Sequence, residues 1–294
     1  MINKFVKNNL YKFLESAETL RDKRKRIGSE TAKGGFKNEI HICEKFKNWK
    51  TDKDAKEWLK IMDYNIKTLD SIEAIQIPTV INKNDLDKYN LTIEEYEKIV
   101  RFKKADAQIK LIIKIGDIVK YEYISLKKAN SEADFNQIDK RTVDFYQTMW
   151  GFDDEICSYL KLFTGESKPD RKVYKILKDK RRIFLNEIPE KIQIKIVKFF
   201  NENKFLVLSD ILKGRGGLSA GWMLVTRMYK DFCELDYVLK DINTTINFYS
   251  KDDVCISNRG SLNIGKIFMQ RKGGTPDPTK LQFKFSPCQL FEIK

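Results

Sequence analysis

The chain has 294 residues, of which 41% are hydrophobic, enough to form a large globular core. Its 56 lysine and arginine residues outnumber 42 acidic ones, and the formal net charge of +14 favours a polyanionic partner such as nucleic acid. The five cysteines lie far apart and the only histidine is His41, so neither a disulfide framework nor a zinc site is indicated. No segment approaches a membrane span, and we expect a cytoplasmic protein.

The first hundred residues are predicted to be mainly helical. Apolar residues three and four apart predict a helix over residues 2–23, with a stripe made of Val6, Leu10, Phe13, Ala17 and Leu20. We interpret this stripe as packing on its own domain, and a dimer interface is the alternative. Further helices are predicted over residues 36–49, 51–62 and 92–101. Glu39 lies at the edge of the apolar face of the first of these, and on periodicity alone it is a surface acid.

Residues 104–130 predict a β-hairpin, because two runs rich in Ile, Val and Tyr flank a turn at Gly116-Asp117. With a two-residue turn, the numbers of opposing residues sum to 233, so Asp106 faces Lys127 and Gln108 faces Ser125. The other face is apolar and is predicted to form the core; it holds Ala107, Ile109, Leu111, Ile113, Ile115, Ile118, Ile124 and Leu126. The polar face is therefore expected to be turned toward solvent or a cleft.

The polar face of this hairpin is the first candidate for catalysis. An acid near the start of one strand, followed by Ser-x-Lys near the end of the next, resembles the nuclease core written PD-(D/E)XK. Ala105 stands where Pro is usual, and Ser125 where an acid is usual. The pattern alone is weak in a lysine-rich chain, and the alternative is a cross-strand ion pair between Asp106 and Lys127 worth only about 0–1 kcal/mol.

Two polar segments follow the hairpin. Residues 135–140 (FNQIDK) carry side chains that can form paired hydrogen bonds with base edges, and a capped helix start is the alternative interpretation. The segment then continues as largely helical to Gly165. Residues 168–182 (KPDRKVYKILKDKRR) are strongly basic and are predicted to meet the DNA backbone.

The second half alternates helices and strands, which indicates an α/β unit presenting basic loops such as KGRGG, with Arg215. Helices are predicted over Pro189–Asn203 and Glu234–Tyr249. Strands are predicted for FLVLSDIL, WMLVTRMY, VCIS, SLNIGKIFMQRK and KLQFKF. No GxxxxGK[ST] motif occurs, which argues against an ATPase with a P-loop.

Several segments together resemble the type II restriction endonucleases of the HinP type, which are relatives of MspI and cut GCGC. In the same order from about Gly28 to the C-terminus, these segments are TAKGGFKNE, FNQIDK, MWGFDD, FTGE, DKRR, LVLSDILKGRG, RGSLNIG, QRKGG, LQFKFSP and LFEI. The resemblance implies an α/β fold, with a PD-(D/E)XK-type mixed sheet flanked by helices and a second α/β part for DNA recognition. It places the catalytic core at residues 29–150 and the recognition part at 151–294, after a helical extension over 1–28 that has no counterpart.

The resemblance also implies site residues. The family's catalytic pattern falls on Asp106, Ser125 and Lys127, with Glu39 as the helix glutamate, and it implies Mg²⁺ held by Asp106 and Glu39. The implied DNA-binding residues are Phe135, Gln137, Asp139, Lys140, Arg215, Arg259, Ser261 and Asn263. Among them, the paired N–H donors of the Arg259 guanidinium match guanine O6 and N7. Phe135 is the candidate for insertion into the base stack.

The implied partner is double-stranded DNA, cut within GCGC by a monomer that nicks one strand at a time and leaves short 5′ overhangs. A dimer formed through the N-terminal helix is the alternative, and a cognate DNA methyltransferase is the expected companion activity. Two other functions are considered: a basic DNA-binding protein without catalysis, and a PD-(D/E)XK repair nuclease without sequence specificity.

Overall fold

The computed structural model describes residues 37–78, 81–89, 91–98, 107–129, 135–228, 235–272 and 279–293. The chain divides into two compact units, Met1–Asn38 and Glu39–Lys294, and both sheets described below lie in the second. The predicted helix over residues 2–23 and the predicted catalytic residue Asp106 lie outside the described residues.

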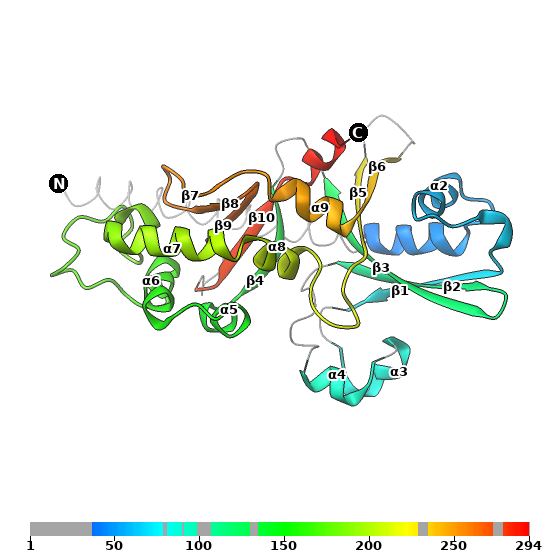
Figure 1. Cartoon of the computed structure of the whole chain (residues 1–294), viewed down its shortest axis with the longest axis horizontal. Helices are drawn as coiled ribbons and strands as arrows, with labels where there is room; N and C mark the ends of the chain where they lie inside the picture. The colour runs from blue at the N-terminus through cyan, green and yellow to red at the C-terminus, as the bar shows by residue number, and fades with distance from the viewer. Residues whose placement is uncertain are drawn as a thin grey trace, which may run out of the picture. The chain divides into compact units, whose positions relative to one another are not determined.

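The first of the two sheets, which we call sheet A, is mixed and has the strand order β1-β2-β3-β5-β6 (Figure 1). Its strands are β1 (Ser71–Ile77), β2 (Gln108–Ile115), β3 (Ile118–Ala129), β5 (Trp222–Met228) and β6 (Leu235–Asp241). Only the β3–β5 pair is parallel among the pairs of this sheet. The β2–β3 hairpin pairs Gln108 with Ser125 and Ile115 with Ile118, which confirms the predicted register.

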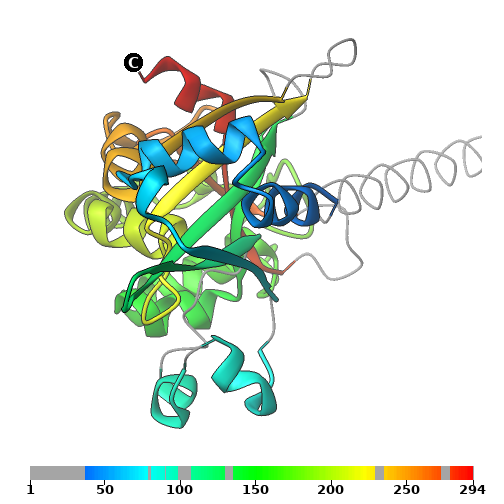
Figure 2. The same ribbon diagram turned by 90° about the vertical axis from the view of Figure 1, so that its right-hand side faces the viewer.

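One face of sheet A is covered by helices (Figure 2). A helix that includes residues 39–47 packs there beside α2 (Lys53–Ile61), and Phe46 and Trp58 are fully buried between them and the strands. The predicted core residues Ile109, Leu111, Ile113, Ile124 and Leu126 are at most 2% exposed. Ile118, also predicted to be in the core, is 58% exposed because it lies at the tip of the hairpin.

The opposite face of the hairpin is open near its tip, as predicted, where Val119 and Tyr121 are exposed, but its other end is buried. Gln108, Lys110, Ser125 and Lys127 are all less than 5% exposed. A small apolar cluster packs on this side, formed by β1, by residues that follow it and by the distant Leu218; its buried members are Ile77, Ile81, Leu86, Tyr89, Leu91 and Leu218. Leu86 and Tyr89 of this cluster lie in α3 (Leu86–Tyr89), which follows η2 (Lys83–Asp85) and precedes α4 (Ile93–Lys98).

The second sheet, sheet B, is antiparallel with the order β4-β10-β9-β8-β7. Its strands are β4 (Asn136–Arg141), β7 (Val254–Ile256), β8 (Leu262–Ile264), β9 (Ile267–Arg271) and β10 (Leu281–Phe285). Its apolar face belongs to the largest core cluster. The helices of this region are α5 (Val143–Trp150), α6 (Asp154–Thr164), α7 (Glu190–Glu202), α8 (Lys204–Leu212) and α9 (Ile242–Tyr249), with short η4 (Leu185–Glu187) and η5 (Pro287–Glu292). The other face of sheet B is mainly polar.

Two predicted elements have a different structure. Residues 205–212, predicted as a strand, form α8, in which Val207, Leu208 and Ile211 are buried while Phe205 is exposed. The predicted helix over 234–249 begins as β6 and becomes α9 only after Asp241, whose carboxylate caps the helix by accepting from the backbone N–H groups of Asn243 and Thr244. A short apolar run fits either element, so periodicity does not decide these cases.

Sheet A takes β5 and β6 from beyond residue 150, and sheet B takes β4 from before it. The division of strands therefore does not follow the predicted boundary between the two parts. Within the described ranges, no helix is long and apolar enough to span a membrane.

Candidate functional site

Two buried polar side chains face each other at one end of the β2–β3 hairpin. The Gln108 amide nitrogen donates to the carbonyl of Leu218 at 2.7 Å, and Ser125 lies opposite Gln108 in the register. Within the described part of the chain, Gln108 Oε1 and Ser125 Oγ are buried without a hydrogen-bond partner. A buried polar atom left unsatisfied costs about 1–3 kcal/mol, so this pair is a candidate ligand site. Gln108 was not among the predicted site residues, although the register already placed it opposite Ser125.

Lys127 links the two sheets. Its side chain is on the same face of β3 as Ser125, and its ammonium donates to the carbonyl of Gln137 in β4 at 2.9 Å. It also lies 5.7 Å from the ring centroid of Phe285 in β10. The ladder between β2 and β3 continues to Ala107, whose carbonyl accepts from Leu126, and Asp106 is the next residue outside the described range. The opposition of Asp106 and Lys127 stays a prediction.

Glu39 shares its surroundings with Lys127. Burial raises the pKa of the Glu39 carboxyl, and the Lys127 ammonium acts in the opposite direction and lowers it. The amide nitrogen of Gln76 donates to Glu39 at 3.5 Å. Another acid of β3, Glu122, accepts from the Tyr64 hydroxyl at 2.7 Å and from the Trp222 indole at 3.0 Å, so its carboxylate has a structural role.

The donor atoms of this region suit a hard cation. The described residues contain no group of three or more His, Cys, Asp or Glu side chains that could hold a metal ion. The Glu39 carboxylate and the unpartnered oxygens of Ser125 and Gln108 are nevertheless all oxygen donors, the ligand type that Mg²⁺ prefers. Residues that fit a magnesium ion are therefore present, and the predicted ligand Asp106 lies two residues before Gln108 in the sequence.

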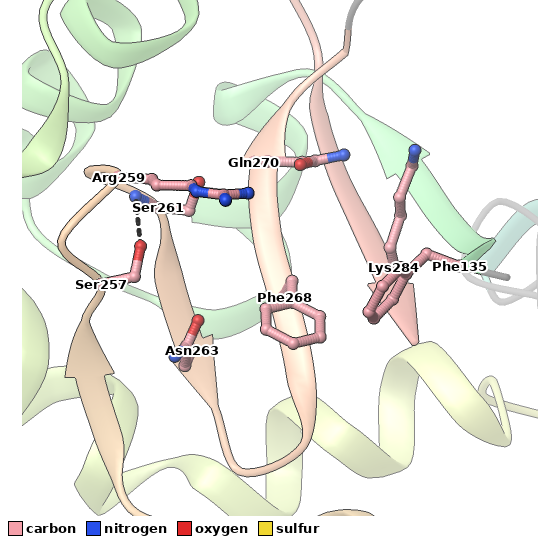
Figure 3. Close-up of a pocket in the computed structure, with 8 residues that line it drawn as sticks. All are labelled: Phe135, Ser257, Arg259, Ser261, Asn263, Phe268, Gln270 and Lys284. Carbon is pink, nitrogen blue, oxygen red and sulfur yellow. Dashed lines mark hydrogen bonds between the residues drawn. The ribbon is translucent and has the colours of Figure 1, made fainter. Parts of the chain in front are cut away.

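A second candidate surface is the polar face of sheet B. A pocket of about 320 Å³ opens there, and four of its lining residues, Phe135, Arg259, Ser261 and Asn263, are predicted DNA-binding residues (Figure 3). The other lining residues, missed by sequence reasoning, are Ser257, Phe268, Gln270 and Lys284. Arg259 and Lys284 are cations and the remaining polar residues offer both donors and acceptors, a combination able to contact base edges and phosphates.

Arg259 is carried by a tightly fixed turn, residues 257–261. Gly260 donates to the Ser257 carbonyl and Ser257 to the Ser261 carbonyl, both at 2.8 Å. Gly260 has φ +76°, and a Cβ at this position would lie 2.6 Å from the Cβ of Phe184 and 2.5 Å from Asn186 Oδ1. Only glycine fits here, and the turn holds Arg259 in place over the polar face, where its side chain extends toward Gln270 (Figure 3).

Gln137 and Lys140 contribute to the same face of β4. The Gln137 side-chain oxygen accepts from Gln282 at 2.9 Å. Burial and the neighbouring charges of Lys272 and Lys280 lower the pKa of Lys140. Mutual repulsion among these lysines would be relieved by a bound polyanion.

Asp139 and Arg215 are not brought into this pocket. Asp139 is 2% exposed and accepts from the Tyr146 hydroxyl at 2.6 Å and from Arg141 at 3.0 Å. Arg215 holds the buried carboxylate of Asp210 with two nitrogens, at 2.6 and 2.7 Å. Both side chains therefore have structural partners, and the geometry gives no support to their predicted contact with DNA.

Comparisons with known proteins agree with this architecture. The family model described as R.HinP1I restriction endonuclease matches residues 87–291, more than two thirds of the chain. No curated protein matches. Among solved structures, the restriction endonuclease MspI in complex with its cognate DNA is similar, with a TM-score of 0.53 and 10% identity over 84% of this chain and 87% of that one. At this identity, the structural likeness shows the fold, a mixed α/β arrangement.

Proposed function

The chain belongs to the R.HinP1I restriction endonuclease family and is a type II restriction endonuclease, and on this premise we propose that it cuts double-stranded DNA at GCGC with Mg²⁺, leaving short 5′ overhangs. The observation that carries the proposal is the pocket on sheet B. Phe135 and the group Arg259, Ser261 and Asn263 come from segments more than a hundred residues apart, yet they line one polar cavity.

The cations of the pocket suit guanine. In the major groove, guanine presents two acceptors, O6 and N7, which match the paired donors of Arg259, and cytosine presents an N4–H donor. Ser261 and Asn263 offer oxygen acceptors for such a donor, and Lys284 adds a second cation. Arg259 and Lys284 favour guanine, as recognition of GCGC requires.

Cleavage is assigned to the site on sheet A. Lys127, held by the Gln137 carbonyl, would orient the attacking water or stabilise negative charge developing on the phosphate. Glu39 and Asp106 would hold Mg²⁺, and the buried oxygens of Ser125 and Gln108 would orient its water ligands. When bound, the ion lowers the pKa of a water molecule and neutralises charge on the scissile phosphate.

Lys127 also gives the two activities a physical connection. Its ammonium bonds to the backbone of Gln137, whose own side chain belongs to the polar face of sheet B. A shift of β4 on binding the correct sequence would therefore move the acceptor that holds Lys127. Because the chain carries one such site, we expect a monomer that cuts the two strands in separate visits, so nicked circles should precede linear DNA.

The test is incubation of unmethylated plasmid with the protein in Mg²⁺ and, in parallel, in EDTA. We expect discrete fragments in Mg²⁺ and intact plasmid in EDTA. A smear would instead indicate a nuclease without specificity, and intact plasmid that shifts on a gel would indicate a DNA-binding protein without catalysis. Plasmid methylated at the inner cytosine should resist cutting, as protection by a companion methyltransferase would require.

A further inference from the structure

The long loop between α6 and η4 is a cationic surface outside the two candidate sites, and it was predicted from its charge to meet the DNA backbone. Residues 168–182 contain eight lysines and arginines and two aspartates, a formal charge of +6 in a chain whose total is +14. Most of these cations are exposed, among them Lys172 and Lys175. The loop therefore concentrates a large part of the positive charge of the protein in fifteen residues.

This loop has a defined buried side. Pro169 is buried, and Tyr174 and Leu177 pack against the largest core cluster. Its C-terminal end is held by Asp179, which accepts from the backbone and side chain of Arg181, and by Ile183, which donates to the Leu162 carbonyl at 3.0 Å. A merely solvated charge run would not need such anchors.

The outward side combines cations with exposed apolar side chains. Val173 is 69% exposed and Ile176 is 93% exposed, although Tyr174 and Leu177 beside them pack inward. A protein surface that mixes lysines with exposed apolar side chains can bind a partner that carries both negative charge and apolar patches. The sugar-phosphate backbone, with apolar sugar edges lining the minor groove, is such a surface.

The loop borders the same end of sheet B as the DNA-reading pocket. Asp179 lies 3.6 Å from Arg271, the last residue of β9. Phe184, just after the loop, is the side chain that lies against Gly260 in the turn that carries Arg259. Lys140 lies at this end of the sheet too, and the nearby charges of Lys272 and Lys280 add to burial in lowering its pKa. A cationic surface therefore continues from the pocket toward the loop.

We propose that residues 168–182 bind the backbone of duplex DNA flanking the recognised site, with Lys172 and Lys175 contacting phosphates and Ile176 contacting sugars. The inference rests on the proposed function only in taking duplex DNA as the substrate. The inference adds a contact with DNA that does not depend on the base sequence. A duplex no longer than the recognised site cannot reach this contact.

The test measures affinity for two duplexes in EDTA, a 10-bp and a 30-bp duplex with the same central site, the site being the one cut in plasmid DNA. We expect the double variant Lys172→Ala/Lys175→Ala to bind the long duplex about tenfold more weakly and the short duplex as the wild type does. On the long duplex, the slope of log K against log salt should decrease by about 1.8, since each phosphate contact contributes about 0.9. Ile176→Ser should weaken binding to the long duplex only.

The control is Lys60→Ala/Lys67→Ala, which removes two exposed lysines beside sheet A and should leave both affinities unchanged. Equal affinity of the wild type for the two duplexes, or equal losses on both in the loop variant, would overturn the inference while leaving the proposed function intact. So would a wild-type dimer that Ile176→Ser converts to a monomer, since the apolar side chain would then belong to a protein interface. If the wild type neither cuts nor binds either duplex, the proposed function and this inference fail together.

Discussion

Replacing Gly260 by alanine should impair DNA recognition from a position that needs no contact with DNA. The residue has φ +76°, a conformation that costs a residue with a Cβ about 1–2 kcal/mol. The new Cβ would also lie 2.5 Å from Asn186 Oδ1 and 2.6 Å from the Cβ of Phe184. Contacts this short are not tolerated, and Phe184 is stacked under the Arg182 guanidinium at 4.1 Å, so the turn itself must move.

The expected size of the effect follows from Arg259. Displacing this side chain would remove the proposed bidentate contact with guanine, and such a contact is worth about 1–3 kcal/mol, or roughly 5- to 150-fold in rate. Gly260→Ala and Arg259→Ala should therefore lose cleavage of GCGC to a similar extent. Only Gly260→Ala should also lower the free energy of unfolding, by more than the backbone strain alone.

Gly116→Ala is the matched control. Gly116 has φ +56° at the tip of the β2–β3 hairpin, and nothing lies within 4 Å of the position that a Cβ would take there, so it carries the backbone strain without the collision. This variant should lose about 1–2 kcal/mol of stability and keep its discrimination. The assay is single-turnover cleavage of a GCGC duplex and of a duplex with one base pair changed, alongside denaturant unfolding. Wild-type rate and discrimination in Gly260→Ala would refute the reasoning.

Three further outcomes test the two sites and the loop. Lys127→Met should abolish single-turnover cleavage, while a gel-shift assay should show that DNA binding is retained. Ser125→Ala should lower the cleavage rate least, because its hydroxyl only orients a ligand. Equal losses of cleavage rate in the two variants would contradict the assignment. Arg215→Ala should lower the free energy of unfolding in urea by about 1–3 kcal/mol with unchanged discrimination, because it leaves the buried Asp210 without its cation. Hydrogen bonds from Arg181 lower the pKa of Asp179 from 3.8 to about 2. The contribution of Asp179 to stability is therefore present above pH 3.8 and is lost as the pH falls toward 2. Asp179→Asn should flatten this part of a plot of unfolding midpoint against pH.

The part of the candidate site on sheet A that is set by local geometry was predictable. The two-residue turn at Gly116-Asp117 fixes the hairpin register, and the register alone places Gln108 opposite Ser125. The burial of one end of this polar face was not predictable, because it depends on tertiary packing with Leu218 and with Leu86, Tyr89 and Leu91, which no local pattern in the hairpin shows. Burial by this packing is also what leaves the Gln108 and Ser125 oxygens without water or a partner.

The residues of the pocket on sheet B could have been identified from a different pattern in the sequence. Phe268 and Gln270 alternate with buried residues along β9, and Lys284 does so along β10, the pattern of a strand with one polar face. That period-two alternation marks these residues as neighbours of Asn263, and sequence reasoning passed over it. For Arg215 the signal was a basic side chain in a glycine-rich loop, which predicted DNA contact; the structure shows that this side chain pairs with Asp210, a partner that the loop sequence did not indicate.

The central claim is that the polar face of sheet B selects the sequence that the site on sheet A cuts. Sequencing every fragment end from an unmethylated plasmid digested in Mg²⁺ tests it most directly. The account predicts that all ends map to GCGC and carry short 5′ overhangs. Ends at another tetranucleotide, or ends scattered without a shared sequence, would contradict it.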